Sequence, residues 1–184
     1  MPRILPIKRA DATGKVKQLL DGVESKLGMV PQLMTTLANS PAALEAYLAF
    51  SGSLGQGFLD PAFREQIALA VAQANSCEYC LSAHAALGAL ARLTPEEIEA
   101  SREARSTDAR KHAGLEFAQS VVVQRGDVPG SAIDSVRAAG YSDGEIVEIV
   151  AHVALNVLTN YVNHVARTQV DFPRVPVAIA KRAA

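Results

Sequence analysis

The nine residues Ser76–His84, with the sequence SCEYCLSAH, hold both cysteines of this 184-residue chain. Cys80 follows Cys77 by three positions, and His84 follows Cys80 by four. Residues three, four or seven positions apart lie on one face of an α-helix. A helix over residues 77–90 therefore places two thiols and an imidazole side by side, and Glu65 on the preceding helix can reach them.

This arrangement predicts thiol chemistry. Cys77 falls in the first turn of the predicted helix, where unpaired backbone N–H groups and the helix dipole stabilise an anion and lower a thiol's pKa. His84 can accept the proton of Cys80, and Glu65 can orient His84 or relay the proton. We expect Cys80, the thiol nearer to His84, to attack and Cys77 to resolve.

Peroxide reduction is the reaction that fits these roles. The Cys80 thiolate attacks a hydroperoxide and becomes a sulfenic acid, which the Cys77 thiol converts to a disulfide with loss of water. An external dithiol must then reduce the disulfide. The sequence predicts no haem, flavin or metal for this cycle.

Other interpretations of the cysteine pair stay open. They are a general thiol–disulfide oxidoreductase, a decarboxylase-type enzyme that does not use the thiols, and a non-enzymatic helical protein with a structural disulfide or metal. A zinc site usually draws its ligands from two separated clusters, and the chain has one Cys-x-x-Cys and no second.

Composition and the N-terminal segment indicate which binding partners and which cellular compartment to expect. The formal net charge is -1, which gives no reason to expect nucleic acid as a partner. We find no run of about 18 apolar residues that a membrane span needs. The basic segment Met1–Ala10 precedes no apolar region of a secretory signal, so we expect a cytoplasmic protein.

The whole chain predicts an all-α fold. Alanine and leucine are abundant, apolar residues recur at helical spacing, and alternating β-branched runs are scarce. The predicted helices cover residues 15–27, 31–37, 41–54, 61–74, 77–90, a segment after the cap residue Thr94, and residues 108–123, 131–139 and 143–170. We expect one domain over residues 1–184, with its core at about 26–173 and an extended tail over 171–177.

A weak internal repeat is compatible with the sequence. Glu65 and His84 are 19 residues apart, and so are Glu145 and His164 at an offset of 80. In the second copy valine and asparagine replace the two cysteines. A true repeat would leave the chemistry in the first copy and make the second a scaffold.

One pattern in the chain consists of Glu65, eleven intervening residues, Cys77-x-x-Cys80, three intervening residues and His84. This pattern resembles that of the AhpD-like alkylhydroperoxidases of the carboxymuconolactone decarboxylase superfamily. Pro31-Gln32-Leu33 and Asp171-Phe172-Pro173 also look like its peroxidase-related branch. The resemblance spans roughly residues 26–173.

The resemblance implies an AhpD-like helical fold and a homo-oligomer, commonly a trimer or a hexamer. It implies that Cys80 is peroxidatic and Cys77 resolving, that His84 and Glu65 form the proton relay, and that a lipoyl-bearing protein supplies the electrons. The best-known members of the family carry a second histidine just before the second cysteine. Here Tyr79 stands in that place, and we expect its hydroxyl to contribute to substrate binding.

The helix over residues 143–170 carries two further signals. His152, Asn156, Asn160 and His164 form a polar stripe at steps of four, which predicts a hydrogen-bonded network between helices or subunits, or part of the substrate pocket. The segment Val153–Val165 is otherwise apolar on nearly all sides. Such a helix must be enclosed, which also favours a homo-oligomer.

Overall fold

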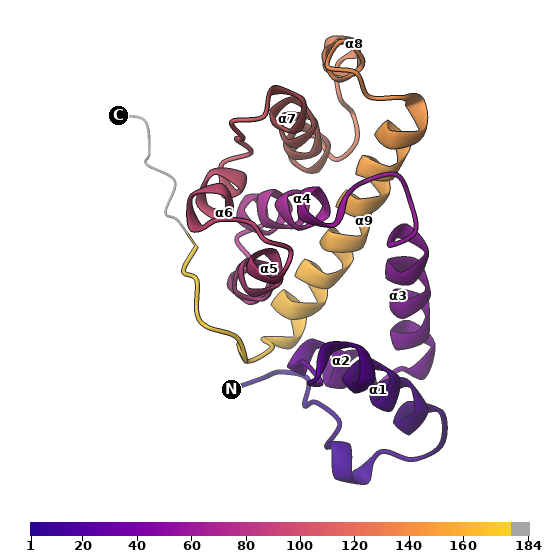
Figure 1. Ribbon diagram of the computed structural model, residues 1–184. Helices are drawn as coiled ribbons and strands as arrows, with labels where there is room; N and C mark the ends of the chain where they lie inside the picture. The colour runs from indigo at the N-terminus through magenta and orange to yellow at the C-terminus, as the bar shows by residue number, and fades with distance from the viewer. Residues whose placement is uncertain (178–184) are drawn as a thin grey trace.

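The computed structural model describes residues 1–177, and within them the protein is entirely helical, with no β-strand (Figure 1). The predicted all-α fold is therefore confirmed. A 3₁₀ turn at Arg9–Asp11 precedes the α-helices. These are α1 (Gly14–Leu27), α2 (Gln32–Leu37), α3 (Pro41–Leu54), α4 (Pro61–Ala74), α5 (Glu78–Leu90), α6 (Pro95–Arg102), α7 (Ala109–Val123), α8 (Gly130–Ala138) and α9 (Asp143–Ala166). Residues 178–184, the end of the predicted domain, lie outside the described residues.

Side-chain caps fix where many of these helices begin. In each, the side-chain oxygen of the N-cap residue accepts a hydrogen bond from the backbone N–H three positions later. The cap residues are Ser40, Asp60, Thr94, Asp108 and Ser142. In α6 and α9 a glutamate returns the bond to the cap residue, which completes a capping box. The helix starts predicted from these residues are thus confirmed.

Several helix boundaries differ from prediction, and two of these differences concern the site. The motif helix α5 begins at Glu78, and Cys77 is its N-cap residue instead of a first-turn residue. α9 ends at Ala166, four residues before the predicted Val170, because Arg167 adopts a left-handed conformation with φ 50°. Its backbone N–H bonds to the carbonyl of Asn163, which closes the helix end.

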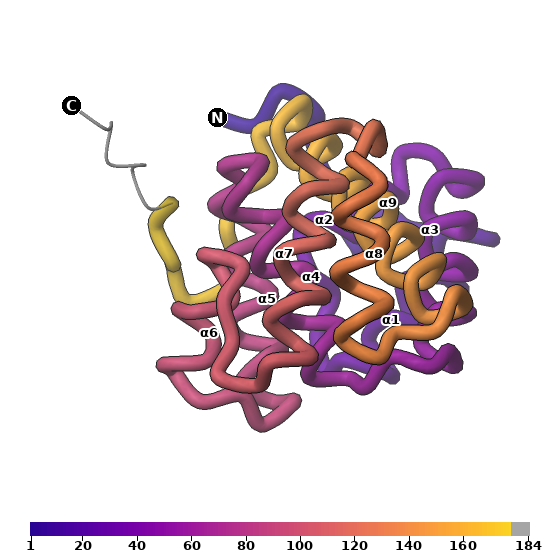
Figure 2. Tube along the Cα trace, turned by 90° about the horizontal axis from the view of Figure 1, so that it is seen from above, coloured from indigo at the N-terminus to yellow at the C-terminus, as the bar shows by residue number. Residues whose placement is uncertain are grey.

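α4 lies at the centre of the fold and packs against α5, α6, α7 and α9 (Figures 1 and 2). Its two faces enter two apolar cores. Leu69 packs with Leu20, Leu44 and Leu81 of the core beneath α1–α3, whereas Ile67 belongs to the core shared with α7 and α9. Each fully buried leucine or isoleucine contributes about 1.5–3 kcal/mol to folding, so α4 is held firmly on both sides.

α9 is the one helix of the described residues that is long and apolar enough to cross a membrane by length and composition. The mean hydropathy of its most apolar window is 1.2, and 44% of that window is buried inside the fold. A core helix of a soluble protein passes the same test. The burial of His152, Asn156, Asn160 and Asn163 on α9 is typical of such a helix.

The chain after α9 is extended, as predicted for residues 171–177, and it lies along α5 and α6 (Figure 1). The carboxylate of Asp171 accepts a bond of 2.7 Å from the backbone N–H of Gln32 at the start of α2. The Val175 N–H donates to the Ser82 hydroxyl on α5 at 3.0 Å. The tail therefore fastens the motif helix from outside.

The internal repeat is not found. Glu65 and His84 lie on two different helices, α4 and α5, whereas Glu145 and His164 both lie on α9. Glu145 forms the capping box of α9 and pairs with Arg110, far along the helix from His164. The spacing of 19 residues therefore has no common structural cause.

Candidate active site

A tight turn between α4 and α5 brings the motif residues together. Ser76 adopts a left-handed conformation with φ 55°, and the Cys77 N–H donates to the carbonyl of Ala72 at 2.8 Å. The chain thus reverses, and α5 runs back along α4. At about 1.5 Å per residue, Glu65 and His84 lie at similar heights above this turn, roughly 15 and 12 Å.

Glu65 and His84 form the contact that this geometry allows. His84 Nδ1 lies 2.7 Å from Glu65 Oε2, and both side chains are about one-fifth exposed. Because an ionised carboxylate only accepts hydrogen bonds, Nδ1 carries the proton and Nε2 is left free as a base or acceptor. The pairing of these two residues, predicted from spacing, is present.

The two thiols also meet. Cys77 Sγ donates to Cys80 Sγ over 2.9 Å, both cysteines are free, and each is 2% exposed. At this separation a disulfide bond needs only a small movement of the side chains. The pair is therefore a buried dithiol poised to close.

The surroundings of the two thiols shift their pKa values in opposite directions. The hydrogen bond from Cys77 lowers the pKa of Cys80, burial opposes this, and hydrogen bonds from Asn163, Asn160 and Thr159 of α9 lower it further. Asn163 Nδ2 lies 3.2 Å from Cys80 Sγ. The same Cys77–Cys80 bond, together with burial, raises the pKa of Cys77 well above its usual range. Cys80 is therefore the thiol that ionises first.

The expectation that the helix N-terminus lowers the pKa of Cys77 is wrong. Cys77 acts as the hydrogen-bond donor to its neighbour and is buried, and both effects stabilise its protonated form. The nearby His84 acts in the opposite direction on the pKa of Cys77 but is a smaller influence.

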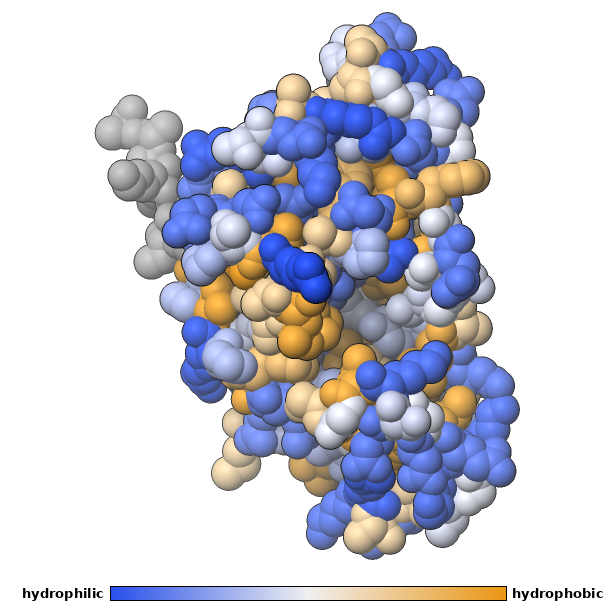
Figure 3. Space-filling model, viewed as in Figure 1, coloured by the Kyte–Doolittle hydropathy of each residue, from blue (hydrophilic) through white to orange (hydrophobic). Residues whose placement is uncertain are grey.

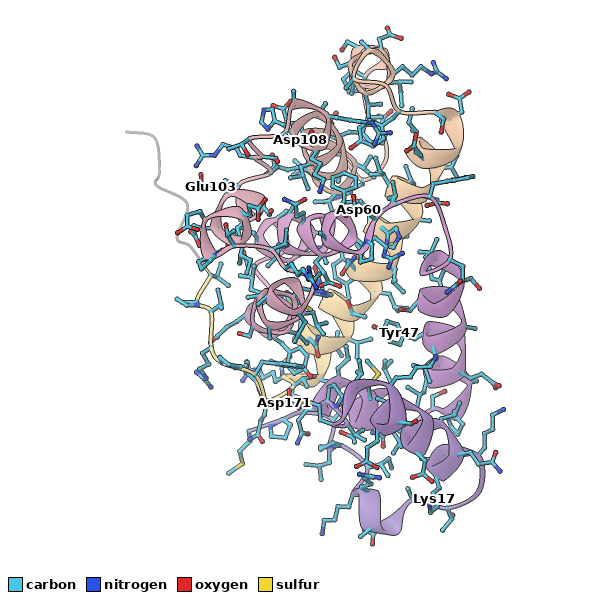
Figure 4. All side chains as sticks on the ribbon, viewed as in Figure 1. Lys17, Tyr47, Asp60, Glu103, Asp108 and Asp171 are labelled. Atoms are coloured by element: carbon cyan, nitrogen blue, oxygen red, sulfur yellow. The ribbon has the colours of Figure 1, made fainter. Side chains whose placement is uncertain are left out.

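Tyr47 is a site residue that the sequence did not reveal. Its side chain points from α3 toward α5 and α9 (Figure 4), and the molecular surface is hollowed between α3 and α5 in the same view (Figure 3). Burial, and then the nearby Glu65 and Cys80, raise the pKa of Tyr47 to about 12. Its hydroxyl thus stays protonated at neutral pH and can donate a hydrogen bond beside Cys80.

Tyr79 packs between α5, α2 and the C-terminal tail. Its hydroxyl accepts a hydrogen bond of 3.1 Å from the backbone N–H of Leu33, and its ring packs edge-on against Phe172 at 5.9 Å. These contacts join α5 to α2 and to the tail. They account for its burial, and substrate binding by Tyr79 stays a prediction.

The polar stripe of α9 forms part of this site. Asn160 accepts a hydrogen bond of 2.9 Å from Asn75, and His164 bonds to the Asn75 carbonyl at 2.9 Å, so α9 is tied to the end of α4. Sequence reasoning missed Asn163 and Thr159, although each is within a few positions of Asn160. Within residues 1–177 we find no group of three His, Cys, Asp or Glu side chains that could hold a metal ion.

Residues 41–120 match the model of the carboxymuconolactone decarboxylase family, and this segment contains the whole Glu65–His84 constellation. The resemblance to this superfamily is confirmed. A search of curated proteins found no significant match.

Solved structures with the same fold support this relationship. The AhpD core of an uncharacterized peroxidase-related protein from Ralstonia eutropha JMP134 is 26% identical, with a TM-score of 0.83 over 95% of this chain and 97% of that one. A peroxidase-related protein from Silicibacter sp. TM1040 is 26% identical, with a TM-score of 0.79 over 90% of each chain. The fold is therefore AhpD-like.

A third structure shares the fold alone. The debrominase Bmp8, in a cysteine-to-alanine variant bound to 2,3,4-tribromopyrrole, is 20% identical, with a TM-score of 0.79 over 92% of this chain and 91% of that one. Proteins of this fold thus include a debrominase as well as peroxidase-related proteins.

We predict that Asn163→Leu raises the pKa of Cys80, because the substitution removes an amide that donates to the thiolate. The absorbance of the thiolate near 240 nm, followed against pH in the reduced protein, measures this directly. The first ionisation should move to higher pH, since Cys77 ionises only far above it.

Asn156→Leu is the matched control for this titration. Asn156 is equally buried on α9, but its amide donates to the His152 carbonyl of the same helix. This variant should keep the wild-type titration. An unchanged curve for Asn163→Leu would show that Asn163 does not stabilise the Cys80 thiolate.

Proposed function

We propose that the protein is a thiol-dependent peroxidase that reduces hydrogen peroxide or organic hydroperoxides through a Cys77–Cys80 dithiol–disulfide cycle. The observation that carries this proposal is the dithiol itself. Its sulfurs lie 2.9 Å apart, and their surroundings favour ionisation of Cys80 and protonation of Cys77. The kinship with AhpD-like, peroxidase-related proteins supports the same chemistry.

In the proposed cycle the Cys80 thiolate attacks the distal oxygen of the hydroperoxide, the O–O bond breaks, and the alcohol leaves with one proton. Cys80 is then a sulfenic acid. The Cys77 thiol attacks the Cys80 sulfur, the S–O bond breaks, and water leaves as the disulfide forms. One hydroperoxide and two thiols thus give one alcohol, one water and one disulfide.

Protons move on the side of the site where Glu65, His84 and Tyr47 lie. We assign His84 Nε2 to take the thiol proton and return it to the leaving oxygen, with Glu65 holding the ring through Nδ1. Tyr47 is a second donor toward the leaving oxygen, because its hydroxyl stays protonated.

The electrons come from an external dithiol, of which a lipoyl-bearing protein is one form. We place the cycle in the cytoplasm, where the prevailing redox poise keeps exposed and catalytic thiols reduced. The proposed cycle needs no metal, haem or flavin.

The first test is the pair of cysteine variants, each treated with one equivalent of cumene hydroperoxide and analysed by mass spectrometry. The reduced wild type should lose two hydrogens and give a Cys77–Cys80 disulfide. Cys77→Ser should gain one oxygen at Cys80 and stop there, whereas Cys80→Ser should react at least 100-fold more slowly.

Three outcomes would contradict the peroxidase proposal. Full turnover by Cys80→Ser would exclude Cys80 as the attacking thiol. A wild-type protein that ignores peroxides yet reduces disulfide substrates would instead be a general thiol–disulfide oxidoreductase. Stoichiometric zinc in the purified protein would favour a structural metal site.

We predict that His84→Asn and Glu65→Gln each slow disulfide formation by about 10- to 100-fold, the range for loss of a proton-transfer group. The two residues act as one unit, so the double variant should be no slower than the slower single variant. Stopped-flow measurement of peroxide-driven oxidation supplies the rates.

A second histidine–glutamate pair provides the control. His112 and Glu116 face each other at 3.6 Å on the surface of α7. His112→Asn and Glu116→Gln should leave the oxidation rate unchanged. If the losses of oxidation rate caused by Glu65→Gln and His84→Asn multiplied fully in the double variant, the two residues would act independently.

We also propose that α9 joins two copies of this chain in a homo-oligomer. Val147, Val150, Leu158, Tyr161 and Val165 are 41–66% exposed. Their spacing on a helix of 3.6 residues per turn places all of them on one narrow stripe of α9. A continuous exposed apolar stripe on a core helix is typical of a subunit interface.

Leu158→Asp should lower the sedimentation coefficient from that of the oligomer to that of the monomer, because a charge would enter the apolar interface. Val123→Asp, at an exposed valine of α7 outside the stripe, should have no such effect. A wild-type protein that sediments as a monomer at micromolar concentration would contradict this interface.

A further inference from the structure

A second opening reaches the dithiol at Cys77, and Tyr47 is not among the residues that line it. A cavity of about 450 Å³ lies between the start of α5 and the end of α9. Its wall includes Arg3, Cys77, Asn163, His164, Arg167 and Thr168. Cys77 lines this cavity, and Cys80 is not among its lining residues. The volume falls within the range of small-molecule sites.

The cavity has a positive rim. Arg3 and Arg167 are both exposed, and within residues 1–177 neither forms an ion pair with a carboxylate. The Arg3 N–H donates to the Ala166 carbonyl at 2.6 Å, which holds the N-terminal segment beside Arg167. The one acid in the wall, Glu78, lies 3.6 Å from Arg174, which offsets its charge.

Two buried polar atoms in the wall lack partners. Asn163 Oδ1 and Thr168 Oγ1 make no hydrogen bond within the described residues, and Asn163 is 5% exposed. Buried polar atoms in folded proteins are nearly always hydrogen-bonded. An amide oxygen can accept from an incoming S–H group, and a hydroxyl can donate to a carboxylate. Both unused groups therefore suit a polar ligand.

We propose that this cavity binds the reductant, a small dithiol that carries a carboxylate, and that one of its sulfurs attacks Cys77. The inference rests on the disulfide cycle proposed above and names the class of its reductant. Arg3 and Arg167 would pair with the carboxylate, because guanidinium groups bind carboxylates through paired hydrogen bonds. Since Cys77 is only 2% exposed, a slender molecule inside the cavity reaches it more readily than the surface of a large protein.

The electron balance follows from the geometry. The reductant thiolate forms a bond to Cys77 Sγ, the Cys77–Cys80 bond breaks, and Cys80 leaves as the thiolate that Asn163 stabilises. A leaving thiol of lower pKa departs faster, so attack at Cys77 is the favoured direction. The second thiol of the reductant then attacks its own sulfur in the mixed disulfide and releases Cys77, which takes a proton. The reductant is oxidised by two electrons and the protein is reduced by two.

The test uses two dithiols that differ in charge, dihydrolipoate and the neutral dihydrolipoamide. The protein disulfide is prepared with diamide, so the measurement does not depend on reactivity toward peroxides. Reduction is followed under pseudo-first-order conditions by quantifying the protein thiols. At low salt dihydrolipoate should be at least about fivefold faster, and 0.5 M NaCl should remove most of this preference, because exposed charges are screened.

Arg3→Gln and Arg167→Gln should each reduce the ratio of the two rates by about threefold, typical of one exposed charge pair. Arg105→Gln removes the same charge from an exposed arginine outside the cavity and should keep the wild-type ratio. Equal rates for the two dithiols in the wild type would overturn the proposal in favour of a neutral reductant such as a lipoyl-bearing protein. Failure of diamide to form the disulfide would contradict the dithiol cycle itself.

Discussion

A buried sulfur carries negative charge only where hydrogen-bond donors replace the water it has lost, and Cys80 depends on this constraint. Its donors are the Cys77 thiol and polar side chains of α9 such as Asn163, at 3.2 Å. Charge burial without such partners is costly, and the thiol would stay protonated. The position of α9 relative to α5 therefore determines whether this dithiol can react.

Several contacts in the fold hold α9 in its position relative to α5. Asn75, at the end of α4, bonds to both Asn160 and His164, which ties α9 to the turn before the motif. The left-handed Ser76 reverses the chain at the same place. The tail fastens α5 from outside through Ser82. Polar residues in an otherwise apolar helix are thus explained by the sulfur that they face and by the helix end that they hold.

The sequence predicted what depends on local spacing. The contact between Glu65 and His84 follows from two helices joined by a short turn, and the helix starts follow from capping residues such as Ser142. It did not predict Tyr47 or Asn163, because each reaches the site across tertiary packing from a helix remote in sequence. No local pattern distinguishes a tyrosine that faces a thiol from one that fills a core.

Two predictions made from the local sequence alone were wrong: the pKa of Cys77 and the end of α9. A cysteine at a helix start is expected to ionise readily, yet Cys77 donates its proton to a neighbouring sulfur and is buried. The helix was expected to continue past Arg167 to Val170, but Arg167 turns left-handed and ends it. For Cys77 the contact with Cys80 and burial decided the outcome, and for α9 the backbone conformation of Arg167 did.

The two sulfurs face different surroundings, and this division bears on specificity. Tyr47, Glu65 and His84 can handle protons near Cys80, whereas the cavity beside Cys77 offers arginines and unpartnered polar atoms. A fold that also supports a debrominase does not by itself choose the oxidant. In the proposed cycle, the oxidant would enter beside Tyr47 and the reductant beside Cys77. Because these two proposed routes would use different residues, substitutions in one would change the oxidant or the reductant and leave the other route and the dithiol intact.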